Sequence, residues 1–126
     1  MTVFDTTFLI DLERRKPSAL DLLHELEASR VPLRVPAAAW LEFLAAMPPI
    51  HRHHAALHLA RSVECESFTK EHAEKAAGIW FELARSGVAL SWHDVQVAST
   101  ALALNEPLVT NDAVFARVPG LAVVPH

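Results

Sequence analysis

Short apolar runs alternate with helix-patterned segments along this chain, and this alternation restricts the possible folds more than any other feature. The predicted strands are Thr2–Asp5, Leu33–Val35, Val63–Phe68, Pro107–Thr110 and Leu121–Val124. The predicted helices are Thr6–Arg15, Ser18–Arg30, Ala37–Met47, His53–Ser62, a helix that runs from a Thr69 cap to Ser86, and Trp92–Asn105. Short apolar strands separated by helices are typical of a parallel sheet covered on both faces. We therefore expect a three-layer α/β/α sandwich with a short, mainly parallel central sheet.

The length and composition suit one domain, residues 1–126. Hydrophobic residues make up 52% of the chain, which is enough for one core, and the surplus is compatible with a subunit or partner interface. No apolar run has the roughly 20 residues that a membrane span needs. The lone cysteine, Cys65, fits a reducing compartment, so we expect a cytoplasmic protein in which Cys65 is a small buried residue. The net charge of −4 argues mildly against a nucleic-acid-binding module, but not against an enzyme.

Four acidic residues interrupt segments that are otherwise apolar. Asp5 ends the first predicted strand, and Asp112 follows the strand "PLVT" closely. Asp94 opens the nearly uncharged helix "VQVASTALAL", and Glu42 is the only charged residue between Arg34 and Arg52. Ligands of open parallel sheets bind at the carboxyl ends of the strands, which is where Asp5 and Asp112 are expected.

Each acid also has a simpler interpretation. Asp5, Asp94 and Asp112 have the residue type and position of helix N-caps, and Glu42 suits the solvent face of a buried helix. If the four carboxylates converge instead, their repulsion needs a cation or protonation to offset it. Oxygen ligands of this kind favour Mg²⁺ or Mn²⁺.

The sequence resembles a known family over essentially its whole length. The segments "VFDTTFLIDL", "AAAWLEF", "GVALSWHDVQVASTALA" and "PLVTNDAVFARVPGLAVV" look like the four motifs of PIN-domain nucleases, and most of all like those of VapC-type toxins. The resemblance implies a ribonuclease that uses Mg²⁺ or Mn²⁺ held by three or four acids. Carried over by position, these acids are Asp5, Glu42, Asp94 and Asp112.

The same resemblance implies supporting residues and partners. Thr7 and Thr110 match small polar positions beside the acids, and Asn111 lies next to them. The implied partners are an RNA substrate, a cognate antitoxin and a second copy in a homodimer. Two departures from the family pattern are His93, directly before Asp94, and Val114, where many relatives carry an acid. The alternative function is a catalytically silent PIN-like module that binds RNA or protein.

Other residues have two interpretations each. Trp92, beside Asp94, is either a base-stacking residue or a core or interface residue, whereas Trp80 is expected in the core. Asp11 has the spacing of an exposed helix position. A histidine cluster forms either a polar face or a Zn²⁺ site, and its members are His51, His53, His54 and His58.

Overall fold

A parallel five-stranded sheet forms the centre of the computed structural model, which describes residues 2–50, 61 and 63–126. The strands are β1 (Thr2–Phe4), β2 (Leu33–Pro36), β3 (Glu64–Glu66), β4 (Leu108–Val109) and β5 (Val123–Val124). Their order across the sheet is β3-β2-β1-β4-β5, and every pairing is parallel. Val3 in the central strand pairs with Arg34 on one side and with Leu108 on the other.

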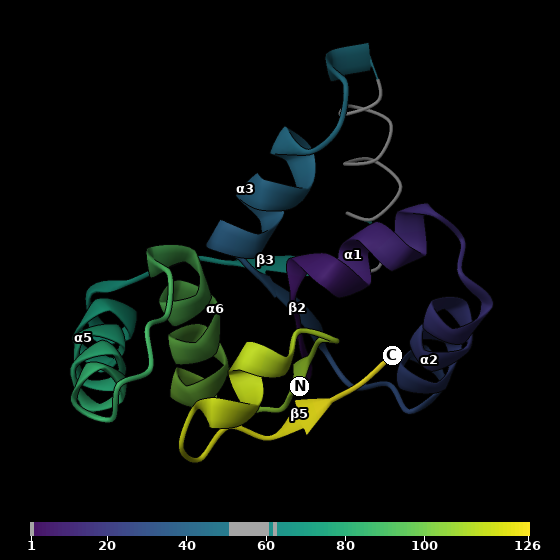
Figure 1. The fold of residues 1–126 in the computed structure, drawn as a ribbon. Coiled ribbons are helices and arrows are strands. Elements are labelled where there is room, and N and C mark those ends of the chain that lie inside the picture. The colour runs from purple at the N-terminus through teal and green to yellow at the C-terminus, as the bar shows by residue number, and fades with distance from the viewer. Residues whose placement is uncertain (1, 51–60, 62) are drawn as a thin grey trace.

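Helices cover both faces of this sheet. They are α1 (Thr6–Glu13), α2 (Pro17–Ala28), α3 (Ala37–Ala45), α5 (Lys70–Arg85) and α6 (Trp92–Ala103), followed by the 3₁₀ helix η1 (Ala113–Arg117). In Figure 1, α1 and α2 lie on one side of the sheet and α5 and α6 lie on the other, while α3 projects upward. The predicted three-layer α/β/α sandwich is therefore confirmed.

The central strands are buried on both faces, which is why they are apolar without alternation. Val3, Phe4 and Leu108 are completely buried in the core of the described residues. Phe8 packs from α1, with its ring 4.7 Å from that of Phe4, and Val97 of α6 is completely buried as well. Burial of this kind stabilises each large side chain by about 1.5–3 kcal/mol.

Local signals at helix ends match the structure. The α5 helix begins at the predicted cap, where Thr69 Oγ1 accepts a hydrogen bond from the His72 amide at 3.3 Å. The His72 Nδ1 atom in turn accepts one from the Thr69 amide at 2.9 Å, which completes a capping box. Gly87 follows the helix with a φ of 77°, a left-handed conformation that favours glycine. The predicted helix His53–Ser62 and the histidine cluster at 51–58 lie outside the described residues, apart from Arg61.

Three expectations about burial are wrong. Cys65 is exposed on the edge strand β3, where only one side of the strand has a partner. Trp80 is 38% exposed rather than part of the core. Asp11 is buried, with partners that suit a buried carboxylate: Lys16 forms an ion pair with it at 3.1 Å, and His126 Nδ1 lies 2.9 Å from its Oδ2 atom. Among the described residues, no helix is both long and apolar enough to cross a membrane.

Candidate active site

The strand order reverses between β1 and β4, and a crevice is expected at the carboxyl ends of these two strands. The chain runs from β1 outward through β2 to β3, and then returns to the opposite side of β1 to form β4. Ligands of open parallel sheets bind where the strand order reverses in this way. Asp5 directly follows β1, and residues 110–112 directly follow β4, so two of the predicted acids flank this reversal.

Asp5 is the most deeply buried of the four acids, with an exposed fraction of 3%. The Thr110 hydroxyl donates a hydrogen bond to Asp5 Oδ2 at 2.8 Å, and the Thr7 hydroxyl lies 3.4 Å from the same oxygen. Burial raises the pKa of Asp5, whereas the hydrogen bond from Thr110 lowers it. The negative charge of Asp94 raises the pKa of Asp5 further. Although Asp5 occupies the N-cap position of α1, its side chain makes no capping hydrogen bond.

Glu42 reaches the same crevice from α3. Its Oε2 atom accepts a hydrogen bond from the Thr6 hydroxyl at 3.3 Å, and Thr6 also lies 3.4 Å from the Ala39 carbonyl oxygen. The Glu42 side chain is 52% exposed, so it borders the crevice and also faces solvent, as its simpler interpretation predicts. Thr6 is almost fully buried, and sequence reasoning overlooked it in favour of Thr7.

His93 connects two of the acids. Its Nε2 atom lies 2.5 Å from Glu42 Oε2, and its Nδ1 atom lies 3.3 Å from Asp94 Oδ1. Despite this contact, Nε2 is buried and makes no hydrogen bond among the described residues.

Asp94 is not the N-cap of α6. Ser91 is the cap, and its hydroxyl accepts a hydrogen bond from the Asp94 amide at 3.0 Å. Asp94 is therefore the third residue of the helix, and its carboxylate lies in the first turn, where the helix dipole favours negative charge. This placement leaves the carboxylate directed at the crevice, with 23% of the side chain exposed.

Asp112 has the role that its simpler interpretation predicts. Its Oδ1 atom accepts a hydrogen bond from the Val114 amide at 3.0 Å and so caps η1. The Asp112 amide donates a hydrogen bond to Thr110 Oγ1 at 3.0 Å. Thr110 also contacts Asp5, so this threonine connects the two acids. The Asn111 side chain is engaged elsewhere: its Oδ1 atom accepts from the His126 amide at 2.8 Å.

The structure thus gathers three of the four predicted acids around one crevice, with Asp112 at its border. Asp5 follows β1, Glu42 lies in the middle of α3 and Asp94 lies in the first turn of α6, so the three acids are far apart in sequence. Within the described ranges, no group of three or more Asp, Glu, His or Cys side chains is placed so that it could hold a metal ion as it stands. The side chains still suit a hard divalent ion, because all four acids offer oxygen ligands. Burial also disfavours the ionised form of Asp5, as its raised pKa indicates, and a bound cation would offset this cost.

Comparison with known proteins places this geometry in a family. The PIN domain family matches residues 2–121. No curated protein matches the chain by sequence. Among solved structures, VapBC2 from Rickettsia felis bound to a promoter DNA fragment has a TM-score of 0.89, with 19% identity over 99% of this chain and 98% of that chain. DNA-bound VapBC from Salmonella typhimurium has a TM-score of 0.86, with 17% identity over 98% and 96%.

A third solved structure resembles the chain less closely in shape. It is VapC20 from Mycobacterium tuberculosis, described as a sarcin-ricin loop cleaving toxin, with a TM-score of 0.66 and 17% identity over 96% of this chain and 98% of that chain. At these identities the structural matches establish the shared fold. Because the family match spans nearly the whole sequence, this chain belongs to the PIN-domain family.

Proposed function

We propose that this chain is a divalent-metal-dependent ribonuclease and the toxin of a toxin–antitoxin pair. One observation carries the proposal: at the reversal point of a parallel sheet, His93 contacts both Glu42 and Asp94, and the charge of Asp94 acts on the buried Asp5 carboxylate, whose pKa burial raises. Such an arrangement costs stability unless a cation or a proton offsets the charge, so a binding role explains it better than a structural one.

Family membership and the named neighbours support RNA as the substrate. The VapC20 structure is described as that of a toxin that cleaves the sarcin-ricin loop, and its fold matches this chain over 96% of the residues. The Rickettsia felis structure is described as VapBC2 bound to a DNA fragment from its promoter, and a similar Mycobacterium tuberculosis structure as a member of the VapBC family of toxin–antitoxin systems. We therefore also propose a cognate antitoxin as a partner of this chain.

Mg²⁺ or Mn²⁺ is the proposed cofactor, and Asp5 and Asp94 are its proposed principal ligands. Glu42 and Asp112 would bind directly, bind through water or orient the nucleophile. When bound, the ion would lower the pKa of a water molecule and offset charge on the phosphate. To join this set, Glu42 must leave Nε2 of His93, and its half-exposed side chain has the freedom to do so.

The surrounding side chains position the acids. The Thr110 and Thr7 hydroxyls hold Asp5 in one orientation, and Thr6 holds Glu42. Fixing the carboxylates before substrate arrives avoids reorganisation during the reaction. Attack by water would leave a 5′-phosphate and a 3′-hydroxyl, so the RNA itself needs no 2′-hydroxyl chemistry.

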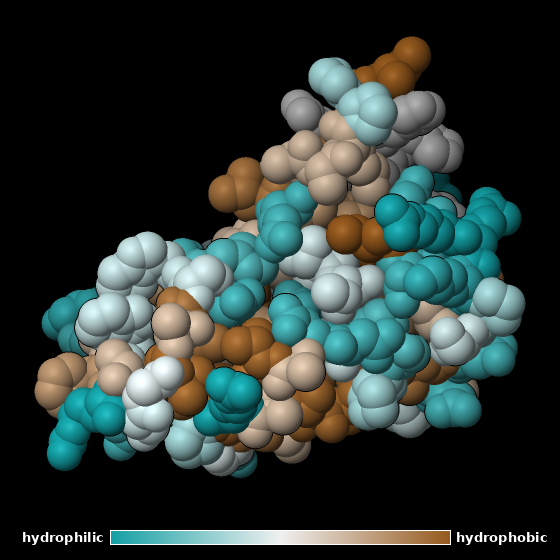
Figure 2. Space-filling model, in the orientation of Figure 1, coloured by the Kyte–Doolittle hydropathy of each residue, from teal (hydrophilic) through white to brown (hydrophobic). Residues whose placement is uncertain are grey.

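Apolar surface on α3 and beyond it supports a protein partner. Leu41 is 69% exposed and Ile50 is 82% exposed, and the projecting end of the molecule at the top of Figure 2 carries tan and brown surface beside pale teal residues. Exposed apolar surface of this kind commonly marks an interaction site. We propose that such surfaces serve the antitoxin and a homodimer, and that the protein acts in the cytoplasm.

A cleavage assay tests the function. Purified chain is incubated with a pool of structured RNA in the presence of Mn²⁺, Mg²⁺ or EDTA, and an equally folded Asp94→Asn variant is treated in parallel. Cleavage that requires metal and is absent from the variant is the expected result. Cleavage that persists in Asp94→Asn would assign the activity to another site or to a contaminant.

The alternative is a catalytically silent PIN-like module. The contact of Glu42 with His93 and the capping role of Asp112 favour it, because both carboxylates already have partners. A folded wild-type protein that neither cleaves RNA nor binds Mn²⁺ would establish this alternative in place of the nuclease.

A further inference from the structure

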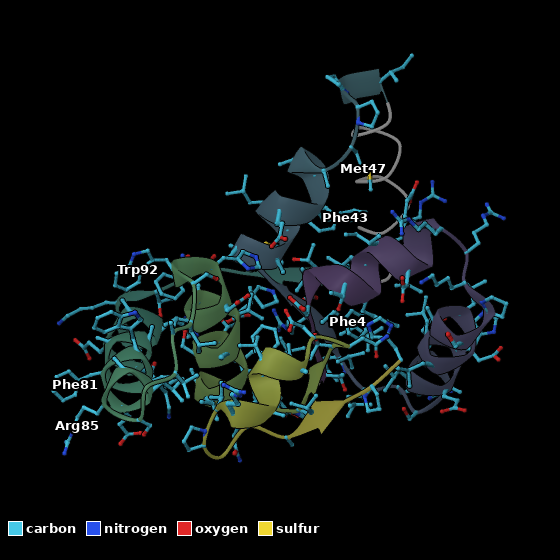
Figure 3. All side chains as sticks on the ribbon, in the orientation of Figure 1. Phe4, Phe43, Met47, Phe81, Arg85 and Trp92 are labelled. Carbon is cyan, nitrogen blue, oxygen red and sulfur yellow. The ribbon has the colours of Figure 1, made fainter. Side chains whose placement is uncertain are left out.

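Two buried titratable side chains, Asp11 and His126, lie beside the candidate site and have no part in the function proposed above. Asp11 comes from α1 and His126 from the segment after β5, and the His126 side chain has no exposed surface. Figure 3 shows Phe4 beneath α1 at the centre of the molecule. Phe8 packs on Phe4, and the His126 ring packs on Phe8 with 5.0 Å between ring centroids. The imidazole therefore has a fixed orientation, and each of its nitrogen atoms has a defined neighbour.

Asp11 determines which nitrogen of His126 carries the proton. Burial lowers the pKa of His126 and so favours the neutral ring. Asp11 Oδ2 lies 2.9 Å from Nδ1, and an ionised carboxylate can only accept a hydrogen bond. The neutral ring therefore carries its proton on Nδ1, which leaves Nε2 as an acceptor. Asn111 Nδ2 also lies 3.2 Å from Nδ1, but it donates to the main-chain oxygen of His126 at 2.6 Å instead.

The acceptor Nε2 lies next to Thr7, which also contacts Asp5. Thr7 Oγ1 is 3.3 Å from Nε2 of His126 and 3.4 Å from Oδ2 of Asp5. A hydroxyl group has one proton, so these two acceptors compete for it. Thr110 Oγ1 also lies 3.3 Å from Thr7 Oγ1, but it already accepts a hydrogen bond from the Asp112 amide.

This competition bears on Asp5 as a proposed metal ligand. Thr110 already donates to Asp5 Oδ2 at 2.8 Å, and a second proton from Thr7 would engage the same oxygen further. A lone pair that accepts a hydrogen bond is not available to a cation. His126 offers the Thr7 proton another acceptor, so the hydroxyl can turn away from Asp5 without becoming an unpaired donor.

We propose that His126 Nε2 accepts the Thr7 hydroxyl proton when a divalent cation binds to Asp5, so that His126 is a positioning residue of the metal site. The inference rests on the proposed metal-dependent function and gives the Asp11–His126 pair a role in it. The only movement that it requires is rotation of one hydroxyl group. The proton stays on Thr7, and no covalent bond is made or broken.

Calorimetric titration of Mn²⁺ into His126 variants tests the inference, at a pH of about 8, where histidine is neutral. His126→Phe keeps a ring beside Phe8 but has no Nε2, and its Mn²⁺ affinity should fall by about 10-fold. His126→Gln has an amide oxygen that can accept the Thr7 proton, and it should retain most of the affinity. The matched control is His72→Gln, which removes a buried histidine of α5 and keeps a residue suited to the capping box. It should bind Mn²⁺ as the wild type does.

A double-mutant cycle with Thr7→Val separates positioning from a structural role of the His126 ring. If His126 acts through the Thr7 hydroxyl, His126→Phe should weaken Mn²⁺ binding when Thr7 is present and cause no further loss in Thr7→Val. A ring that only supports the fold would have the same effect in both backgrounds. Equal losses of affinity in the two backgrounds would therefore overturn the inference.

The position of the ring proton is a second readout, which needs no metal. Imidazole nitrogen chemical shifts, with the His126 signals assigned by their loss in His126→Gln, should identify the tautomer with the proton on Nδ1. A proton on Nε2 would overturn the inference, because that atom could not then accept from Thr7.

The outcomes also distinguish this inference from the proposed function. Mn²⁺ binding that is unchanged in His126→Phe would reject the role of His126 and leave the metal site in place. Mn²⁺ binding that shows the expected coupling, in a protein that never cleaves RNA, would support the role of His126 and reject the nuclease. Absence of Mn²⁺ binding from the wild-type protein would reject both.

Discussion

At the scale of single residues, the candidate site depends on one threonine. Thr110 donates a hydrogen bond to Asp5 at 2.8 Å and accepts one from the Asp112 amide at 3.0 Å. Thr110 is 1% exposed, so its hydroxyl is shielded from bulk solvent. Its contact lowers the pKa of Asp5 against the effect of burial, and it also fixes which oxygen of the carboxylate faces the crevice.

Replacing Thr110 with valine keeps the shape of the side chain but removes the hydroxyl. We predict that Thr110→Val loses about 1–3 kcal/mol of unfolding free energy, because a buried carboxylate loses its donor. Its Mn²⁺ affinity should fall by about 10–100-fold, as for other residues that support metal ligands. Urea denaturation and titration calorimetry measure the two quantities. Thr110→Ser keeps the hydroxyl and should restore both; an equal loss in Thr110→Ser would contradict the role assigned to the hydroxyl.

The sequence indicates the candidate acids but not their contacts. Asp5, Glu42 and Asp94 are visible because charge is rare in their segments, and all three reach the crevice. The contact of His93 with Glu42 is a tertiary one between α6 and α3, so no spacing within one helix indicates it. Asp11 was expected on an exposed face for the same reason, since its burial depends on His126 from the other end of the chain.

At the scale of secondary structure, the first turn of α6 determines where Asp94 lies. Ser91 caps this helix through the Asp94 amide itself, so the cap and the candidate ligand are physically connected. The α5 helix has a comparable cap in Thr69, which is part of no carboxylate cluster. The two caps therefore form a natural pair for separating helix stability from function.

Removing either cap should destabilise the protein similarly. We predict that Ser91→Ala and Thr69→Ala each lose about 1 kcal/mol of unfolding free energy, the usual value for such caps. Only Ser91→Ala should also weaken Mn²⁺ binding, because it loosens the turn that carries Asp94. Denaturation and calorimetry on both variants provide the comparison. If Thr69→Ala weakened metal binding as much as Ser91→Ala, the effect would be one of general stability.

The sequence predicted which segments are helices and which are strands, because each depends on local periodicity. It predicted the residues at which they begin and end less well. The last strand was expected at Leu121–Val124 and occupies only Val123–Val124, since pairing with the two-residue strand β4 limits its length. The α3 helix ends at Ala45 rather than at Met47, two residues earlier than apolar content alone indicates.

At the scale of the whole molecule, strand order brings distant segments together. Sequence patterns do not specify that β4 lies beside β1, yet this pairing places Thr110 against Asp5, 105 residues away. The segment after β5 adds a further connection, because the His126 ring contacts Asp11 at 2.9 Å and packs against Phe8 with 5.0 Å between ring centroids.

His126 should make stability depend on pH. Burial lowers its pKa, partly opposed by the charges of Asp11 and Asp5 and reinforced by that of Lys16. The folded protein therefore binds this proton less readily than the unfolded chain does. Its contribution to stability is fully present above a pH of about 6.5 and decreases as the pH falls below that value.

The comparison of wild-type protein with His126→Gln isolates this contribution from that of other groups. Between pH of about 7.5 and about 5.5, the wild-type unfolding free energy should fall more steeply than that of the variant. Urea denaturation at both pH values measures the difference. Identical pH dependence in the two proteins would mean that His126 titrates normally in the folded state.

The most direct test of the central claim is calorimetric titration of Mn²⁺ into wild-type protein and into three variants, Asp5→Asn, Asp94→Asn and Asp21→Asn. Asp21 is an exposed acid on α2, so its variant controls for the loss of one negative charge. We predict that wild type and Asp21→Asn bind Mn²⁺, whereas Asp5→Asn and Asp94→Asn lose most of that binding although they remain folded. Binding that is unchanged in Asp94→Asn and Asp5→Asn, or absent from the wild-type protein, would contradict the assignment of a metal-dependent active site to these carboxylates.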